Sequence, residues 1–500
     1  MSLRTRARRA SVLVAGGVLV ASGLGLAVPA PVAHAADTPA PEAAAAANWL
    51  AGVIGDDGLI PGGGVNGFFY AANLDFGVGL VQTGQAPSAA LTKIVDGVDA
   101  TVASYVGDPA APANAGKLAQ AAYFYAVTGG DPKAAGDSVL DLETALEAQV
   151  DDTTGQLGNI DYAGNQVWAV LALTQLGSDE AEKARDFLVG QRETGDAAGW
   201  GFGDGTSNPD ITSWAVQALA TWSWNTRVHT AMEAGVAYLK SVQVGGGIED
   251  PYLGVNANST GAAAHAFAEA GHPAEAAAAA TWIAEHQVVA LPRCGVTPTH
   301  AGAIAYDDAT LAGGIGDDDL DQTAPATAQA LVGLAYLPRS APTVSATTSY
   351  VAAGANVAVK VAGLRATQPA CVSGGATPVK KTGPGAVTIK APAGTATRTL
   401  TLTTLGVTRT TTLKVLAATK LAVKAPLSAR RGTTVAITVS RLAPGEKVTV
   451  TVGGVRVVGK ATSAGTYVAR LTAPRRAGTA KVVVVGQFVN RTGTTTFRVR

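Results

Sequence analysis

Polar side chains that could bind or act on a small molecule recur where a series of apolar segments begins, in the first two thirds of the chain. They are Asn73, Asp75, Asn165, Asp210, Thr212, Asn258, Asp321 and Gln322, with Trp168 and Trp214 within about one turn of two of them. Amide and carboxyl groups orient a ligand through directed hydrogen bonds, and indole rings offer it flat apolar faces. The same positions also suit helix caps, in which the side chain accepts a hydrogen bond from a free backbone N–H group. Ligand binding and helix capping therefore remain alternative roles for these residues.

The two cysteines, Cys294 and Cys371, carry a separate chemistry. In an oxidising compartment a lone pair of cysteines most often forms a disulfide. We expect this bond, with both residues in loops and with the bond joining the two halves of the chain. The alternative is two unrelated buried thiols that pack as small apolar residues.

An internal repeat must position the polar residues. Four helical patterns end in Gln and continue into a Gly-rich turn, at Gln149, Gln191, Gln243 and Gln287. Apolar inner helices are expected to begin near 71, 114, 164, 211, 258 and 323, and polar-faced outer helices to span 41–53, 87–106, 132–149, 179–192, 227–243 and 273–287. Six alternating pairs favour a closed two-layer ring over an open solenoid. The starts of the inner helices would then meet at one rim, which would form the mouth of a ligand site.

The fourth repeat carries the most specific motif of the chain. Gln191-Arg192-Glu193 precedes Gly199-Trp200-Gly201-Phe202, and Pro209-Asp210-Ile211-Thr212-Ser213-Trp214-Ala215 follows. This pattern resembles the Gln-Trp repeat of the squalene–hopene cyclase and protein prenyltransferase superfamily. The resemblance covers about 300 residues and implies an (α/α)6 toroid with a central cavity. It is poor support for any one activity, because the superfamily also includes cobalamin carriers and thioester complement proteins.

The resemblance also supplies a catalytic alternative. Terpene cyclases of this superfamily protonate an alkene with the middle Asp of an Asp-x-Asp-Asp-Thr-Ala motif, and this chain has Asp319-Leu320-Asp321-Gln322-Thr323-Ala324. Asp321 would match the general acid and Asp319 its neighbour, but Gln322 replaces the third Asp. A carboxylic acid that protonates a hydrocarbon must be held neutral and polarised by its surroundings. The departure from the motif puts that arrangement in doubt.

No cofactor or metal is expected. Cys294 and His300 lack the companion ligands of a zinc site, and the thioester motif Cys-Gly-Glu-Gln is absent. The acidic turns 204–210 and 317–319 lack the fixed pattern of a calcium-binding loop, so solvated turn residues are the simpler interpretation. No phosphate-binding loop or nucleotide fingerprint occurs, and no nucleic-acid partner is expected.

After Pro338–Pro342 the helical period disappears, and short Val/Thr/Leu alternations bounded by Gly and Pro take its place. Two similar openings, ending at Gly354 and Gly432, each lead into a Val-rich strand. The pattern predicts two tandem immunoglobulin-like (Ig-like) β-sandwiches, at 341–417 and 418–500. The fold class is thus α followed by all-β, with an (α/α)6 toroid over 36–340.

Charge is divided sharply between the two regions. Residues 36–340 carry 10 Lys and Arg against 36 Asp and Glu, whereas residues 341–500 carry 23 Lys and Arg against one acid. A surface with a net charge of +22 predicts adsorption to anionic wall polymers or acidic lipids, with strong salt dependence. The alternative is that the basic region docks on the acidic region of its own chain.

The first 35 residues have the pattern of a secretory signal peptide. Four arginines precede the apolar stretch Ser11–Val28, and Ala33-His34-Ala35 follows as a cleavage site. A transmembrane anchor is the alternative, and no anchor is expected after cleavage. The sequence therefore predicts a secreted, non-catalytic protein that binds a small molecule or partner and is held to the cell envelope by its basic domains. An exported cyclase and a cobalamin-carrier-like protein remain the alternatives.

Overall fold

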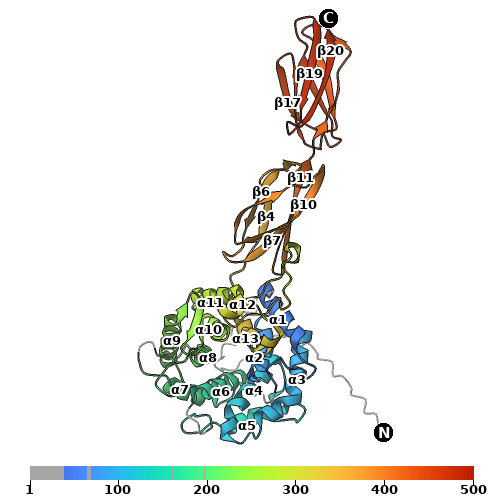
Figure 1. Cartoon of the computed structure of the whole chain (residues 1–500). Helices are drawn as coiled ribbons and strands as arrows, with labels where there is room; N and C mark the ends of the chain where they lie inside the picture. Colours follow the sequence, from blue (N-terminus) through green and yellow to red (C-terminus); the bar gives the residue numbers. More distant parts are fainter. Residues whose placement is uncertain (1–38, 65–68, 159–161, 196–197) are drawn as a thin grey trace, which may run out of the picture. The chain divides into compact units, whose positions relative to one another are not determined.

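The computed structural model describes residues 39–64, 69–158, 162–195 and 198–500 (Figure 1). A helical region comes first and an all-β region follows, as the sequence predicted. The predicted signal peptide, residues 1–35, lies outside the described residues.

Six helices form the inner set of the helical region. They are α2 (Ala71–Gln82), α4 (Ala115–Thr128), α6 (Ala163–Leu176), α8 (Pro209–Ala220), α10 (Ala257–Glu269) and α13 (Leu320–Ala330). Their starts lie close to the predicted ones. Small residues allow these helices to approach closely: a side chain on Gly261 of α10 would come within 2.6 Å of the Ala330 backbone of α13. The abundance of Ala and Gly in this region therefore reflects close helix packing.

The other helices alternate with the inner set along the chain. They are α1 (Pro41–Val53), α3 (Ala89–Val106), α5 (Leu142–Ala148), α7 (Ala181–Gly190), α9 (Thr226–Ser241), α11 (Pro273–Glu285) and the short α12 (Asp308–Gly313). Short 3₁₀ helices occur at Pro112–Asn114, Pro132–Ala134, Pro292–Cys294, Asp317–Asp319 and Leu331–Tyr336. The apolar faces of the helices share two buried clusters, which contain most of the aromatic and aliphatic residues of the region.

The inner helices pack on one another in a closed circuit. Helix α2 packs on α4, α4 on α6, α6 on α8, α8 on α10, α10 on α13, and α13 returns to α2 (Figure 1). Three of the glutamines that end the repeats, Gln149, Gln243 and Gln287, connect neighbouring units. For example, Gln287 Nε2 donates to the Glu42 carbonyl at 2.8 Å, which joins the last repeat to the first helix.

Five of the inner helices share a buried hydrogen bond that holds the preceding turn against the helix. A side-chain oxygen on the helix accepts the backbone N–H of an apolar residue in that turn. The pairs are Asn73 with Ile60, Gln166 with Leu157, Thr212 with Trp200, Thr260 with Ile248 and Thr327 with Ile304, at 2.8–2.9 Å. Buried backbone donors need partners, so these five side chains stabilise the repeat.

Two parts of the helical region differ from the sequence prediction. The third outer helix begins at Leu142 rather than near 132, because the chain turns through positive φ at Gly136 and Val139. A small antiparallel sheet, β1 (Gln243–Val244), β2 (Gly247–Asp250) and β3 (Gly254–Asn256), was not predicted. Its strands have two to four residues, too few for an alternating pattern to be recognised.

The first β region contains two sheets that share one buried core. One has the order β5 (Tyr350–Ala352), β11 (Val407–Leu416), β10 (Ala396–Thr404), β7 (Pro369–Ser373) and β8 (Val379–Thr382). The other has the order β4 (Thr343–Ala346), β6 (Asn356–Ala362) and β9 (Gly385–Lys390). Alternating Val residues of β6 point into the core, as the sequence pattern predicted.

The second β region also has two sheets around one core. One has the order β12 (Thr419–Lys420), β20 (Arg491–Val499), β19 (Gly478–Val485), β16 (Lys447–Val452) and β17 (Val455–Lys460), with β14 (Ser428–Ala429) also paired to β20. The other has the order β13 (Ala422–Lys424), β15 (Thr434–Ser440) and β18 (Tyr467–Thr472).

The structure joins Cys294 and Cys371 by a disulfide, the pairing expected from the sequence, with their Cα atoms 5.8 Å apart. The prediction that both lie in loops was wrong for Cys371, which belongs to strand β7, and Cys294 ends a 3₁₀ helix. The bond therefore links the helical region covalently to a core strand of the first β region.

Candidate functional site

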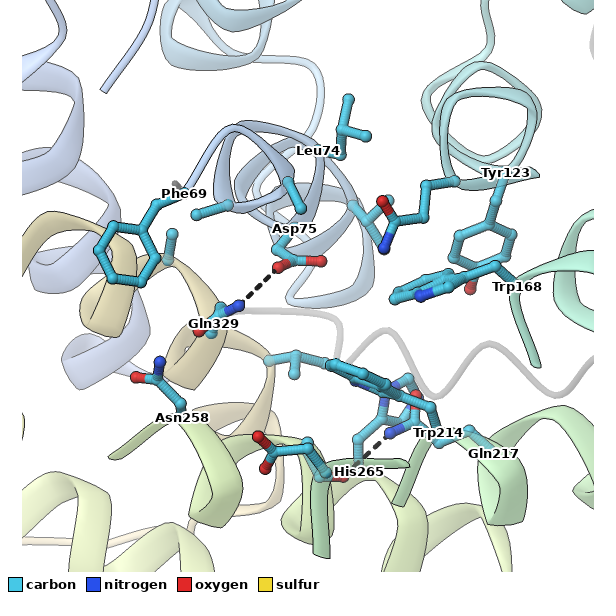
Figure 2. A pocket seen from close by; sticks show the side chains of 18 of the residues that line it. Phe69, Leu74, Asp75, Tyr123, Trp168, Trp214, Gln217, Asn258, His265 and Gln329 are labelled. Carbon is cyan, nitrogen blue, oxygen red and sulfur yellow. Dashed lines mark hydrogen bonds between the residues drawn. The ribbon is translucent and has the colours of Figure 1, made fainter. Parts of the chain in front are cut away.

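A cavity of about 580 Å³ opens among the inner helices. Side chains from all six helices of the circuit line it, and Figure 2 draws 18 of the lining residues around the space, ten of them labelled. The volume lies within the range of roughly 300–1,000 Å³ that is usual for sites that bind small molecules.

The polar lining follows a simple rule of helix geometry. Side chains seven residues apart lie on the same face of a helix, two turns from one another. Four inner helices each contribute such a pair to the cavity: Asp75 and Gln82, Asp210 and Gln217, Asn258 and His265, and Gln322 and Gln329. Each helix thus presents a polar group near its start and a second one two turns deeper.

Asp75 is held by one neutral partner. Gln329 Nε2 donates to Asp75 Oδ2 at 3.1 Å, the bond drawn in Figure 2. Burial among helices raises the pKa of Asp75 to about 6, and the bond from Gln329 offsets only part of this effect. At neutral pH Asp75 is an anion, and no positive side chain among the described lining residues compensates its charge.

Asp210 is a second buried carboxyl group on the cavity wall. Burial raises its pKa to about 6, the Ser259 hydroxyl lowers the pKa in part, and the charge of Asp250 raises it further. Its Oδ1 atom is buried and has no hydrogen-bond partner in the part of the chain that the structure describes. Asn208, two residues earlier, caps helix α8 by accepting the N–H groups of Asp210 and Ile211. The Asp210 side chain is therefore not needed as a cap.

An aromatic wall lies in the same cavity. The Trp168 and Trp214 rings have centroids 5.4 Å apart, and Tyr123 lies 6.1 Å from Trp168. Figure 2 shows these three rings turned toward the space that Asp75 also faces. Leu74, Val78, Leu171 and Val332 supply aliphatic surface. The cavity thus combines aromatic and aliphatic walls with a few polar groups, an arrangement suited to binding an organic molecule in one orientation.

The structure brings six of the predicted binding residues into this cavity. They are Asp75, Trp168, Asp210, Trp214, Asn258 and Gln322. Three others do not line it. Asn73 and Thr212 are fully buried and make the turn-holding bonds described above, and Asn165 packs against Gly116.

The two residues of the catalytic alternative also lie outside the cavity lining. Asp321 is exposed, and Asp319 is exposed with its carboxylate accepting the backbone N–H of Gly316 at 2.8 Å. Neither side chain is placed where it could protonate a substrate within the cavity. Gln322, which replaces the third Asp of the cyclase motif, does line it.

Sequence reasoning found the first member of each polar pair and missed the second. Gln82, Gln217, His265 and Gln329 each stand seven residues after a residue that was singled out. A polar residue deep in an otherwise apolar inner helix was the available signal. Gln120 of α4 fits the same description and also lines the cavity.

Two features are absent from the described residues. Within them, no three His, Cys, Asp or Glu side chains gather in a group that could hold a metal ion. No helix in the same part of the chain has the length and apolar character needed to cross a membrane.

Comparisons with known proteins do not place the chain in a family. No family model matches it, and no curated protein does. Murine CEACAM1b is a similar solved structure, with 14% sequence identity, coverage of 32% of this chain and 99% of that chain, and a TM-score of 0.20. The three N-terminal domains of the bacteriophage RB49 outer capsid protein Hoc share 12% identity over 32% of this chain and 59% of that chain, with a TM-score of 0.21. A putative membrane anchored protein from Corynebacterium diphtheriae shares 16% identity over 31% of this chain and 53% of that chain, with a TM-score of 0.15. TM-scores this low do not assign a fold or a function.

Proposed function

We propose that the chain is a secreted binding protein whose helical region is an (α/α)6 toroid with a small-molecule site at its centre. The closed circuit of inner helices and the bond from Gln287 to Glu42 support a toroid, as does the resemblance of the fourth repeat to the Gln-Trp repeat. The observation that carries the proposal is the cavity itself, with four polar pairs and an aromatic wall converging on one space.

In the same proposal, two basic Ig-like sandwiches hold this binding domain to an anionic cell envelope. The only acid of residues 341–500 is Glu446, which is buried and paired with Arg491. The exposed charged side chains of this region are therefore all positive, which favours adsorption to polyanions.

The alternatives receive less support from the site. An exported cyclase would need Asp321 within the cavity, and that residue is exposed outside it. A cobalamin-carrier-like function rests on the proposed toroid alone. We therefore favour binding without catalysis.

A neutral fluorescent probe tests the binding site. N-phenyl-1-naphthylamine brightens in apolar surroundings, and we expect saturable binding of one molecule per chain. Ala262 of α10 lines the cavity, so Ala262→Trp should fill the space and abolish the signal. Ala274 is exposed on α11, and Ala274→Trp should leave binding unchanged. Equal signals from the two variants, with both folded by circular dichroism, would show that the probe does not bind in the cavity.

A further inference from the structure

The charges on the cavity wall are unbalanced. Asp75 and Asp210 line it, whereas no Lys or Arg is among the described lining residues. His265 is the one lining residue that could carry a positive charge, and its Nε2 atom lies 3.6 Å from the Glu269 carboxylate. A protonated His265 would thus be offset by a further acid. At neutral pH the described wall of the cavity carries net negative charge.

Neither aspartate has a compensating ion pair among the described residues. Among the described residues, the side-chain partner of Asp75 is the neutral Gln329 amide, and Asp210 Oδ1 has no hydrogen-bond donor. Buried carboxylates are ordinarily paired with a cation or satisfied by several hydrogen bonds. A bound ligand that carries a positive charge would supply what the chain itself does not.

The aromatic wall favours the same ligand class. A cation within about 6 Å of a Trp or Tyr ring face is attracted by the negative face of the ring, and the attraction is greater when the site is sheltered from water. Tyr123, Trp168 and Trp214 form a continuous wall, with neighbouring centroids 5.4–6.1 Å apart. A bare metal ion would not use this wall or the aliphatic surface of Leu74 and Leu171.

We propose that the cavity binds an organic cation, an amine or quaternary ammonium compound with an apolar body, through the Asp75 and Asp210 carboxylates and the Tyr123–Trp168–Trp214 wall. This inference rests on the proposed binding function. A neutral polyol could also bind to the amides and stack on the indoles, but it would leave both carboxylates uncompensated.

A matched pair of ligands isolates the role of charge. Phenyltrimethylammonium and tert-butylbenzene have nearly the same shape and differ by one positive charge. Both should displace N-phenyl-1-naphthylamine from the purified full chain at pH 7.5, and we expect the cation to bind at least tenfold more tightly. In the double variant Asp75→Asn/Asp210→Asn the two affinities should become equal within about twofold. Asp204→Asn, at an exposed turn, should keep the preference for the cation.

The outcomes separate the two proposals. If the dye binds in the cavity but both ligands displace it equally, the proposed binding function stands and the cation inference is wrong. If the double variant retains the preference for the cation, the two carboxylates are not its cause and the inference is again wrong. If neither the dye nor the ligands bind, the proposed function itself fails. Maltotriose, tested in the same assay, would overturn the inference if it bound more tightly than the cation.

Discussion

Gln329 Nε2 donates a hydrogen bond to Asp75 Oδ2 at 3.1 Å, and the two residues are 254 positions apart in the chain. The bond crosses from the last inner helix, α13, to the first, α2, which also pack on each other. It therefore lies where the circuit of inner helices closes, and it fixes a carboxylate on the cavity wall. The same contact therefore joins the closing helices of the circuit and belongs to the wall of the candidate site.

The raised pKa of Asp75 predicts how stability changes with pH. In the unfolded chain this carboxyl has its ordinary pKa of 3.8, and in the folded protein burial raises the value to about 6. The folded state thus binds more protons between these values, so the contribution of Asp75 to stability is present below pH 3.8 and is lost as pH rises through 6. Asp75→Asn should remove this loss and raise the free energy of unfolding at pH 8 by on the order of 2 kcal/mol, with little gain at pH 4.

Urea unfolding at both pH values measures this difference. Tyr105 of α3 and Tyr123 of α4 are the titratable neighbours whose pKa values the Asp75 charge raises, and both remain neutral over the pH range used. Asp204→Asn is the control, because its side chain is exposed on a turn. An equal gain from Asp75→Asn at pH 4 and pH 8 would mean that charge burial is not the cause.

Thr212 should be needed for stability rather than for ligand binding. Its Oγ1 atom accepts the Trp200 N–H and donates to the Trp200 carbonyl, both at 2.9 Å, and the side chain is fully buried. Thr212→Val has a similar shape but leaves the buried Trp200 N–H without a partner, whereas the Trp200 carbonyl keeps the N–H of Asn208 at 2.8 Å. The expected cost is about 1–3 kcal/mol. Thr230→Val, on the exposed face of α9, is the matched control. Chemical denaturation measures both variants, and dye affinity should be unchanged in each.

The sequence predicted the alternation of helices well because apolar and polar-faced segments differ strongly in composition. The six inner helices begin within a few residues of the expected positions. The choice of individual polar residues was less reliable, since the sequence analysis singled out Asn165, whereas its neighbour Gln166 makes the bond equivalent to that of Thr212. Periodicity identifies a helix, but it does not say which of two adjacent polar residues faces the preceding turn.

The site was harder to predict than the helices, because periodicity does not show which face of a helix a given polar residue occupies. Asn73 and Asp75 are two residues apart on α2, so their side chains point in directions about 200° apart. The Asn73 side chain packs against the preceding turn, and the Asp75 side chain lines the cavity. Capping was also assigned to the wrong residues, because Asn208 and Asn256 cap α8 and α10 in place of Asp210 and Asn258. The seven-residue spacing to Gln217 and His265 would have shown which face lines the cavity.

The disulfide should couple the unfolding of the helical region to that of the first β region. Cys294–Cys371 closes a loop of 77 residues, and restriction of the unfolded chain gives about 4 kcal/mol for that size. Peptide mapping without reduction should find the two cysteine peptides joined. Cys371→Ala should lower the denaturant midpoint, and Cys294→Ala/Cys371→Ala should lower it by a similar amount. Two reactive thiols in the unfolded, unreduced chain would contradict the bond.

The basic β regions should bind anionic wall polymers in a salt-dependent way. Lys447 and Lys460 are exposed and directly opposite each other on strands β16 and β17, and Arg456 is exposed on β17. Like charges at this spacing repel one another, and a bound polyanion relieves the repulsion. We expect the full chain to bind purified wall teichoic acid in 50 mM NaCl and to lose most of its affinity in 500 mM NaCl, where the screening length falls to about 4 Å.

A triple variant tests whether these strands carry the binding. Lys447→Gln/Arg456→Gln/Lys460→Gln should weaken binding several-fold in 50 mM NaCl, because three positive charges are removed from one sheet. The control neutralises three exposed basic residues of the helical region instead and should have little effect on binding. These residues are Lys117, Lys133 and Arg227. The competing arrangement, in which the basic regions dock on the acidic helical region, makes the opposite prediction for salt. Added salt would release the docked region, so binding to teichoic acid would be absent at 50 mM NaCl and would first appear at higher salt.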